Sequence, residues 1–112
     1  MIYEFRSYWV EPTLIDQYLD WVNRKAQPLQ RDKFGFRVIG FWRVDGEDGT
    51  VAPDSPNVVW MAAWENRQER DRVWRELRAS PDWAAIGAGL PKFPRRPGNV
   101  KFLTGIECSP LR

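Results

Sequence analysis

The segments RVIGFWRV at residues 37–44, DGEDGTVAPDSPN at 45–57 and VVWMAAW at 58–64 together decide the fold. The first and third are rich in β-branched and aromatic residues, which favour strands. The second consists almost entirely of turn formers. Two strands joined in this way form an antiparallel hairpin, so we expect residues 45–57 to be a long, exposed hairpin loop. Large apolar residues at successive positions indicate that neither face of the sheet is simply open to water.

Gly40 stands in the middle of the first of these two strands, where glycine normally weakens a strand. The favoured interpretation is a β-bulge, or the close packing of a neighbouring aromatic ring. The alternative is a ligand that lies against the backbone at this point.

Before the hairpin, IYEFRSYWV at residues 2–10 has the composition of another strand. Residues 13–32 then carry apolar side chains at three- and four-residue spacing, which predicts a helix. Pro28 falls late in this helix and should kink or end it unless the segment restarts there. Residues 34–36, Phe-Gly-Phe, form a turn into the hairpin.

After the hairpin, Asn66 is a candidate N-cap for a helix at residues 67–79. Ser80 is a candidate N-cap for a second, short helix that begins with proline. The connector PKFPRRPG at 91–98 contains three prolines, which exclude it from the centre of a sheet. The segment NVKFLTGIE at 99–107 predicts the last strand.

The elements follow the order strand, helix, strand, strand, helix, strand, which is the βαββαβ order of a ferredoxin-like fold. The sequence therefore predicts an α+β protein with a four-stranded antiparallel sheet and helices on one face. Its 112 residues leave room for one domain, which we place at residues 1–112.

Both faces of the predicted sheet carry large apolar side chains. The residues that we assign to one face are Ile2, Tyr8, Ile39, Phe41, Val59, Met61 and Leu103. Those that we assign to the other are Phe5, Trp9, Trp42, Trp60, Val100 and Phe102. A lone chain would leave one set in water, and such a patch normally marks an interaction surface. We therefore expect a homodimer whose sheets meet across a two-fold axis, as in a dimeric α/β barrel.

The composition excludes several kinds of chemistry. Lys and Arg total 17 against 15 Asp and Glu, a balance that does not suit nucleic acid. The chain has no histidine, which removes the commonest general base near neutral pH and the usual haem and zinc ligands. The single cysteine, Cys108, cannot build a thiolate cluster. We predict no metal site and no cofactor.

A single cysteine also cannot form an internal disulfide, which fits a reducing, cytoplasmic compartment. The N-terminal residues 1–6 carry charges and lack a long apolar run, so we expect no signal peptide. No stretch approaches the roughly 20 apolar residues of a membrane span.

Glu4, Arg6 and Tyr8 alternate onto one face of the first strand. Because charges on a covered sheet face are unfavourable unless paired, one interpretation is a structural Glu–Arg network. The other is a ligand anchor, in which Arg6 clamps a carboxylate and Tyr8 donates a hydrogen bond. Aromatic candidates that would stack on a flat molecule, or simply fill the core, are Tyr3, Trp42, Trp60 and Trp64.

Two functions are compatible with these residues. The first is the binding of a small hydrophobic or aromatic molecule in a pocket between sheet and helices, or a purely structural role. The second is a cofactor-free enzyme, of the monooxygenase, isomerase or dehydratase kind, on a small aromatic or polyketide-like substrate. In that enzyme Arg6, Tyr8 or Glu4 would shift a proton in a desolvated pocket.

The shape of the interior separates the two functions. An open pocket with a polar group inside would favour catalysis, and a closed, ring-filled interior would favour the binding or structural role. A third reading, a protein-interaction module, rests only on the basic residues 94–97.

Three segments carry a resemblance to a known family: MIYEFRSYWVEP at 1–12, GFRVIGFW at 35–42 and SPDW at 80–83. In this order and spacing they resemble the NIPSNAP family over nearly the whole chain. The resemblance implies the dimeric α/β-barrel fold but little chemistry, because bacterial members are largely uncharacterised. Some relatives with the same barrel are small monooxygenases, dehydratases or haem-binding enzymes, and fold alone does not determine function. Two departures would reshape a pocket: Trp9 stands where a small polar residue is expected, and the loop at 45–57 exceeds a minimal hairpin.

Overall fold

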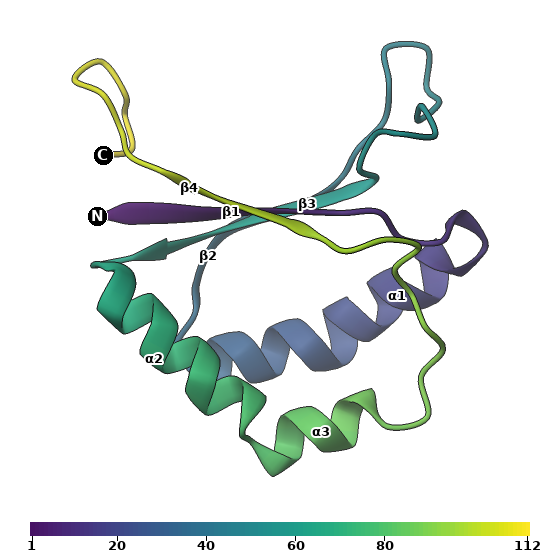
Figure 1. Ribbon diagram of the computed structural model, residues 1–112, viewed down its shortest axis with the longest axis horizontal. Coiled ribbons are helices and arrows are strands. Elements are labelled where there is room, and N and C mark those ends of the chain that lie inside the picture. The colour runs from purple at the N-terminus through teal and green to yellow at the C-terminus, as the bar shows by residue number, and fades with distance from the viewer.

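The computed structural model describes residues 1–112, and its centre is one four-stranded antiparallel sheet (Figure 1). The strand order across the sheet is β2-β3-β1-β4, which places the first and third strands in the middle. This is the ferredoxin-like arrangement that the βαββαβ order predicts. The strands are β1 (Ile2–Tyr8), β2 (Arg37–Arg43), β3 (Val58–Trp64) and β4 (Asn99–Leu103).

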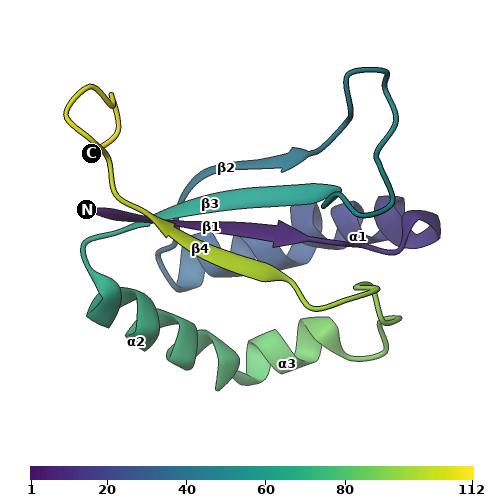
Figure 2. The same cartoon turned by 45° about the horizontal axis from the view of Figure 1, so that its top comes forward.

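The helices all cover one face of this sheet, and they form two separate rows beneath it (Figures 1 and 2). One row is the first helical segment, which includes α1 (Ile15–Trp21) and continues to Lys33. The other row is α2 (Arg67–Arg78) followed by α3 (Pro81–Gly87). None of these helices combines the length and the apolar character that crossing a membrane requires.

Pro28 does not end the first helix, although its position in the sequence suggests a kink or a break. A proline lacks the N–H donor, and its ring crowds the carbonyl four residues earlier. On both sides of Pro28 the winding widens into π-helical turns, at Val22–Ala26 and Leu29–Lys33. The N–H of Gln27 accordingly donates to the carbonyl of Val22, five residues back. These wider turns accommodate the ring and leave the helix continuous.

The two predicted N-caps are present, and they begin α2 and α3 where the sequence indicates. The side-chain oxygen of Asn66 accepts a hydrogen bond from the N–H of Glu69 at 2.8 Å. The hydroxyl of Ser80 accepts one from the N–H of Asp82 at 3.2 Å. Each cap satisfies a donor that the first helical turn leaves unpaired, so both helix starts are determined locally.

The last strand is shorter than the sequence predicts, because β4 ends at Leu103 and not at residue 107. Leu103 already pairs with Tyr3, and β1 begins only one residue earlier, at Ile2. Too little of β1 therefore remains to continue the ladder. The chain turns back instead, with the N–H of Ser109 bonded to the carbonyl of Ile106.

The core lies between the sheet and the helices as two clusters of buried residues. The first joins β3 to α2 and consists of Phe36, Trp60, Ala62, Trp64, Val73, Trp74 and Leu77. The second lies under the first helical segment and consists of Val10, Tyr18, Val22, Val58 and Phe93. Two clusters arise because the helical layer is split into two rows, each of which packs its own apolar stripe against the sheet.

The opposite face of the sheet carries no helix, and the loop at 45–57 and the C-terminal segment rise on that side (Figure 1). This bare face includes Trp42, which is 46% exposed, and Leu103, which is 40% exposed. The strand register places six apolar side chains on it: Tyr3, Phe5, Trp42, Val59, Met61 and Leu103. It is an apolar patch of the kind that normally marks an interaction surface.

The sequence-based assignment of faces has the phases of β3 and β4 reversed. Leu103, paired with Tyr3, lies on the bare face, and Val100 and Phe102, paired with Arg6 and Glu4, lie on the helix face. Ile2 and Phe41 face the helices together with Trp60, and Met61 lies on the bare face with Trp42. Alternation defines the two faces within one strand but not the phase of one strand against the next. Because β3 is apolar on both sides, its hydrophobic pattern carries no information about that phase.

Gly40 combines both features of its favoured interpretation. The pairing of β2 with β3 shifts register between Val38 and Gly40, which is a β-bulge. A Cβ atom at Gly40 would lie only 2.2 Å from Cζ2 of Trp42. The indole ring of Trp42 therefore occupies the space that any other residue at position 40 would need.

Trp9 ties the hairpin loop to the proline-rich connector. Its Nε1 donates to the carbonyl of Asp54 at 3.0 Å, and the guanidinium of Arg96 lies 4.1 Å from its ring centre. Arg96 and Arg95 donate to the carbonyls of Asp54 and Pro53. The large residue at position 9 thus holds the loop, and the two arginines of the connector already have partners within the chain.

Asn57, which is buried next to β3, clamps the chain just after β1. Its Nδ2 donates to the carbonyl of Val10 at 2.8 Å, and its Oδ1 accepts from the N–H of Val10 at 2.9 Å.

Asn57→Ala should lower the free energy of unfolding by about 2–4 kcal/mol, since both polar groups of the buried Val10 lose their partner. Urea denaturation measures the change. The exposed Asn23→Ala is the control, and a loss below about 1 kcal/mol at Asn57 would contradict the clamp.

Candidate functional site

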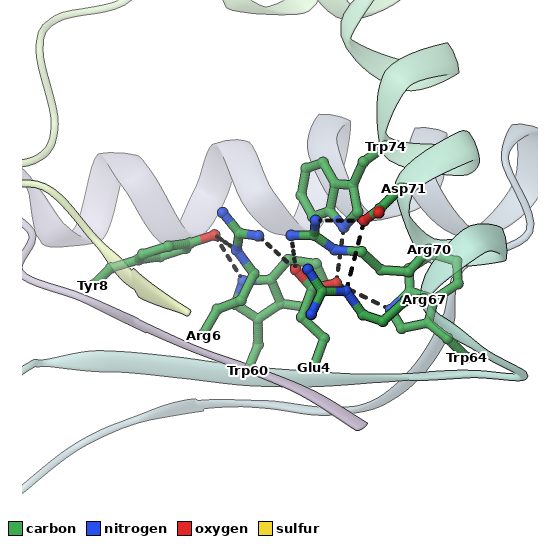
Figure 3. A network of polar contacts seen from close by, with 9 residues as sticks. All are labelled: Glu4, Arg6, Tyr8, Trp60, Trp64, Arg67, Arg70, Asp71 and Trp74. Atoms are coloured by element: carbon green, nitrogen blue, oxygen red, sulfur yellow. Dashed lines mark hydrogen bonds and ion pairs between the residues drawn. The ribbon is translucent and has the colours of Figure 1, made fainter. Parts of the chain in front are cut away.

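The first strand points Glu4, Arg6 and Tyr8 toward the helices, where a hydrogen-bond network joins three elements (Figure 3). Oε1 of Glu4 accepts from Nε1 of Trp64 at 3.0 Å and from Nε1 of Trp74 at 2.8 Å. Oε2 accepts from Nη1 of Arg6 at 2.6 Å and from Nη2 of Arg70 at 2.7 Å. One carboxylate on β1 thereby binds two indoles and two guanidinium groups, which come from β1, β3 and α2.

These four donors decide the ionisation of Glu4, which is only 1% exposed. Burial alone would raise the pKa of Glu4, because the charged form loses its water. The hydrogen bonds from Arg70, Trp74 and Arg6 outweigh burial, and the pKa lies below its ordinary value. Glu4 is therefore an ionised counter-ion at neutral pH, and among the three candidates for shifting a proton it has none to donate.

The hydroxyl of Tyr8 extends the network along β1. It accepts from Nε of Arg6 at 2.8 Å and from Nε1 of Trp60 at 3.0 Å. A phenol oxygen that accepts two N–H groups keeps its own hydrogen available for a third partner. No group of this chain accepts that hydrogen, and Tyr8 lines the cavity described next.

A cavity of about 340 Å³ lies between the sheet and the two rows of helices. It separates the two core clusters, and eleven of its sixteen lining residues are hydrophobic. The lining residues are Arg6, Tyr8, Val10, Tyr18, Trp21, Val22, Ala26, Gln30, Phe41, Trp60, Trp74, Arg78, Trp83, Phe93, Pro94 and Gly98. Its volume falls in the range of roughly 300–1,000 Å³ that is usual for small-molecule sites.

The π-helical part of the first helical segment forms one wall of this cavity. Val22, Ala26 and Gln30 follow one another at intervals of four residues, and all three are buried and line the cavity. π-helical turns occur frequently at functional sites, because they displace side chains from the positions of a regular helix. The same widening that accommodates Pro28 thus shapes the cavity wall.

Tyr18 and Gln30 bring two further polar groups to this wall. Tyr18 is 9% exposed and Gln30 is 4% exposed. Burial raises the pKa of Tyr18, the neighbouring Tyr8 raises it further, and Arg6 acts in the opposite direction. The hydroxyl of Tyr18 is therefore neutral and, with no partner in the chain, remains free to bond a molecule in the cavity.

The structure brings together five of the seven residues that the sequence singles out. Glu4 and Trp64 belong to the network, and Arg6, Tyr8 and Trp60 belong to both the network and the cavity. The other two do not reach this site, since the strand register places them on the bare face: Tyr3 and Trp42.

Sequence reasoning misses several residues of the site. Arg70 and Trp74 lie on α2 and meet Glu4 only in the folded chain. The pattern that points to Arg70 is its place at the edge of an apolar helical stripe, where a cation needs a buried partner. For Tyr18, Gln30 and Arg78 no comparable pattern exists. No group of three or more His, Cys, Asp or Glu side chains is arranged to hold a metal ion.

Residues 3–91 match the sequence model of the NIPSNAP family. The chain belongs to the NIPSNAP family. A comparison with curated proteins gave no significant match.

Solved structures agree with this NIPSNAP assignment at the level of the fold. A NIPSNAP family protein from Agrobacterium tumefaciens has 22% identity and a TM-score of 0.83, over 99% of this chain and 98% of that one. An uncharacterized NIPSNAP-like domain protein from Burkholderia xenovorans has 24% identity and a TM-score of 0.79, over 97% and 88%. An antibiotic biosynthesis monooxygenase is more distant, with 13% identity and a TM-score of 0.59 over 95% and 99%.

Glu4→Gln should lower the free energy of unfolding of this NIPSNAP protein by about 3–5 kcal/mol at pH 7. The substitution leaves Arg6 without a counter-charge in a buried site, and it leaves Arg70 with only the half-exposed Asp71. Urea denaturation measures the loss. The matched control is Glu76→Gln on α2, whose ion pair with Arg72 is half exposed, and it should change stability by less than about 1 kcal/mol.

The stability difference between the natural protein and Glu4→Gln should disappear in acid. The folded pKa of Glu4 is depressed, so its stabilisation is fully present above the unfolded value of 4.5 and is lost as the pH falls through the folded value. Unfolding curves at pH 7 and at successive steps below about pH 4 follow this loss. A difference that persists unchanged at the acid end would show that charge is not the cause.

Proposed function

We propose that this NIPSNAP protein binds a small aromatic molecule in the cavity between its sheet and helices. The observation that carries the proposal is a cavity of about 340 Å³ with aromatic walls and unpaired polar groups. Protein interiors are normally packed with few voids larger than a water molecule. Small-molecule sites, in contrast, combine apolar walls with a few oriented polar groups. The hydroxyls of Tyr8 and Tyr18 are groups of this kind.

The network around Glu4 supports the proposal, because it prepares the site before any molecule enters. Arg6 is held by Glu4 and lies 4.5 Å from the ring centre of Trp74. Arg6 in turn holds Tyr8. A ligand would therefore meet groups whose orientations are already set, which lowers the entropy lost on binding.

A second candidate function, a cofactor-free enzyme, is favoured by the hydroxyl of Tyr8. Because its oxygen already accepts two N–H groups, its own hydrogen is free to bond a molecule in the cavity. This open cavity with polar groups is also what the enzyme hypothesis requires. The two functions differ in one result: a binder returns the bound molecule unchanged, whereas an enzyme converts it, and mass spectrometry after incubation distinguishes them.

We propose further that two chains associate through the bare faces of their sheets. On a single chain Trp42 is 46% exposed and Leu103 is 40% exposed, and Phe5, Val59 and Met61 are partly exposed beside them. Pairing two such faces about a two-fold axis buries the patch of each copy against an equal one. The loop at 45–57 and the C-terminal segment, which rise on either side of this face, would flank the partner (Figure 1).

Filling the cavity should abolish binding without unfolding the chain. Ala26 is buried in the cavity wall, so Ala26→Leu places added bulk inside the cavity. Four of the seven tryptophans line the cavity, and quenching of their fluorescence reports binding of one- and two-ring aromatic probes. We expect saturable quenching with the natural protein and with the exposed control Ala85→Leu, but none with Ala26→Leu. Equal binding by all three proteins would contradict the site.

Introducing a charge on the bare face should separate the two chains. We expect the natural protein to sediment as a dimer at micromolar concentration and Met61→Lys to sediment as a monomer, because the lysine cannot be desolvated against an apolar partner. Ala88→Lys, at an exposed position on the helical side, is the control. A natural protein that sediments as a monomer would exclude the proposed dimer.

A further inference from the structure

The charged side chains that line the cavity are all cationic. Arg6 and Arg78 are both lining residues, whereas no aspartate or glutamate is. Both guanidinium groups lie against the same ring, at 4.5 Å and 4.9 Å from the centre of Trp74. The two cations therefore mark one region of the cavity wall, next to a single indole.

Neither cation has a full counter-charge. The single charge of Glu4 is shared between Arg6 and Arg70. The other acidic partner of Arg70, Asp71, is half exposed and weakened by solvent. Arg78 makes no ion pair within the chain, and its exposed position on α2 places it at the mouth of the cavity. This excess of positive over negative charge makes the site attractive to a molecule with one negative charge.

The neutral polar groups of the cavity also supply donors. The two N–H bonds that Tyr8 accepts direct its own hydrogen elsewhere. Gln30 uses its Oε1 to accept from Gln27, so its own amide N–H groups stay free. Tyr18 and Gln30 are each more than nine-tenths buried and line the cavity. Donors without acceptors, in the same cavity as cations that lack a full counter-charge, are the surroundings that an anion requires.

We propose, building on the proposed function, that the molecule bound in this cavity is an aromatic carboxylate. Its planar carboxylate would lie between the free Nη2 of Arg6, the hydroxyl of Tyr8 and Arg78, because guanidinium forks match the geometry of that group. Its ring would lie against the apolar walls. A sugar phosphate or another extended polar anion does not fit, since eleven of the sixteen lining residues are hydrophobic.

The test compares each acid with its neutral amide. Benzoate and 2-naphthoate are titrated against benzamide and 2-naphthamide, and calorimetry gives the affinities at one fixed salt concentration. The acid and the amide of each pair have nearly the same shape, so the comparison isolates the charge. We expect the better-fitting acid to bind the natural protein about tenfold or more tightly than its amide.

Two variants of α2 locate the charge preference. Arg78→Gln removes the cation at the mouth of the cavity, and Arg75→Gln removes an equal charge from an exposed residue that does not line it. Neither residue makes an ion pair within the chain, so both variants should fold. We expect Arg78→Gln to lose about tenfold in affinity for the acid and little for the amide. We expect Arg75→Gln to leave both affinities unchanged.

The outcomes separate this inference from the proposed function. Amides that bind as tightly as acids would overturn the carboxylate assignment and leave the aromatic site standing. An equal loss of acid affinity in Arg75→Gln and Arg78→Gln would also overturn it, since general surface charge would then be the cause. If neither acids nor amides bind, the aromatic site itself is rejected, and the carboxylate assignment with it.

Discussion

The buried carboxylate of Glu4 is the constraint on which the rest of the structure depends. A charge that is 1% exposed is tolerated only when its lone pairs are occupied, and the four donors around Glu4 do this. Two of them, Arg70 and Trp74, belong to α2. The position of α2 over the sheet is therefore set by specific hydrogen bonds in addition to its apolar stripe of Val73, Trp74 and Leu77.

The cavity follows from how the two rows of helices meet. α2 is held by the Glu4 network, and the first helical segment by the second core cluster. The rows contact each other at their edges, where Nε1 of Trp21 donates to the carbonyl of Ile86 and Lys33 pairs with Asp82. Phe93 closes another side against Tyr18 and Trp21. Between these contacts lies the cavity of about 340 Å³, with Trp60 of β3 in its wall.

The sequence predicts local features well, because their causes are local. The N-caps at Asn66 and Ser80 need only neighbouring residues, and the alternation that puts Glu4, Arg6 and Tyr8 on one face needs only the period of a strand. The phase of β3 was not predictable from an all-apolar segment, and it decides that Trp60 faces the helices and Met61 the bare side. Tyr3 is a candidate for the site by its ring alone, because the alternation of β1 places it on the opposite face from Glu4. The partner of Glu4 on α2 lies 66 residues away in the chain, a distance that no spacing rule covers.

The structural and the ligand-binding interpretations of β1 are compatible, because one series of hydrogen bonds links the buried network to the cavity. Glu4 holds Arg6 through Nη1, and Arg6 holds Tyr8 through Nε, at positions i, i+2 and i+4 of one strand face. Gly98 completes the arrangement, because a Cβ there would come within 2.8 Å of the Tyr8 ring. Glu4, at the buried end of this series of hydrogen bonds, stabilises the fold. Tyr8, at the other end, presents its hydroxyl to the cavity. A substitution at Glu4 would therefore change both stability and the cavity, whereas a change at the cavity mouth would affect binding alone.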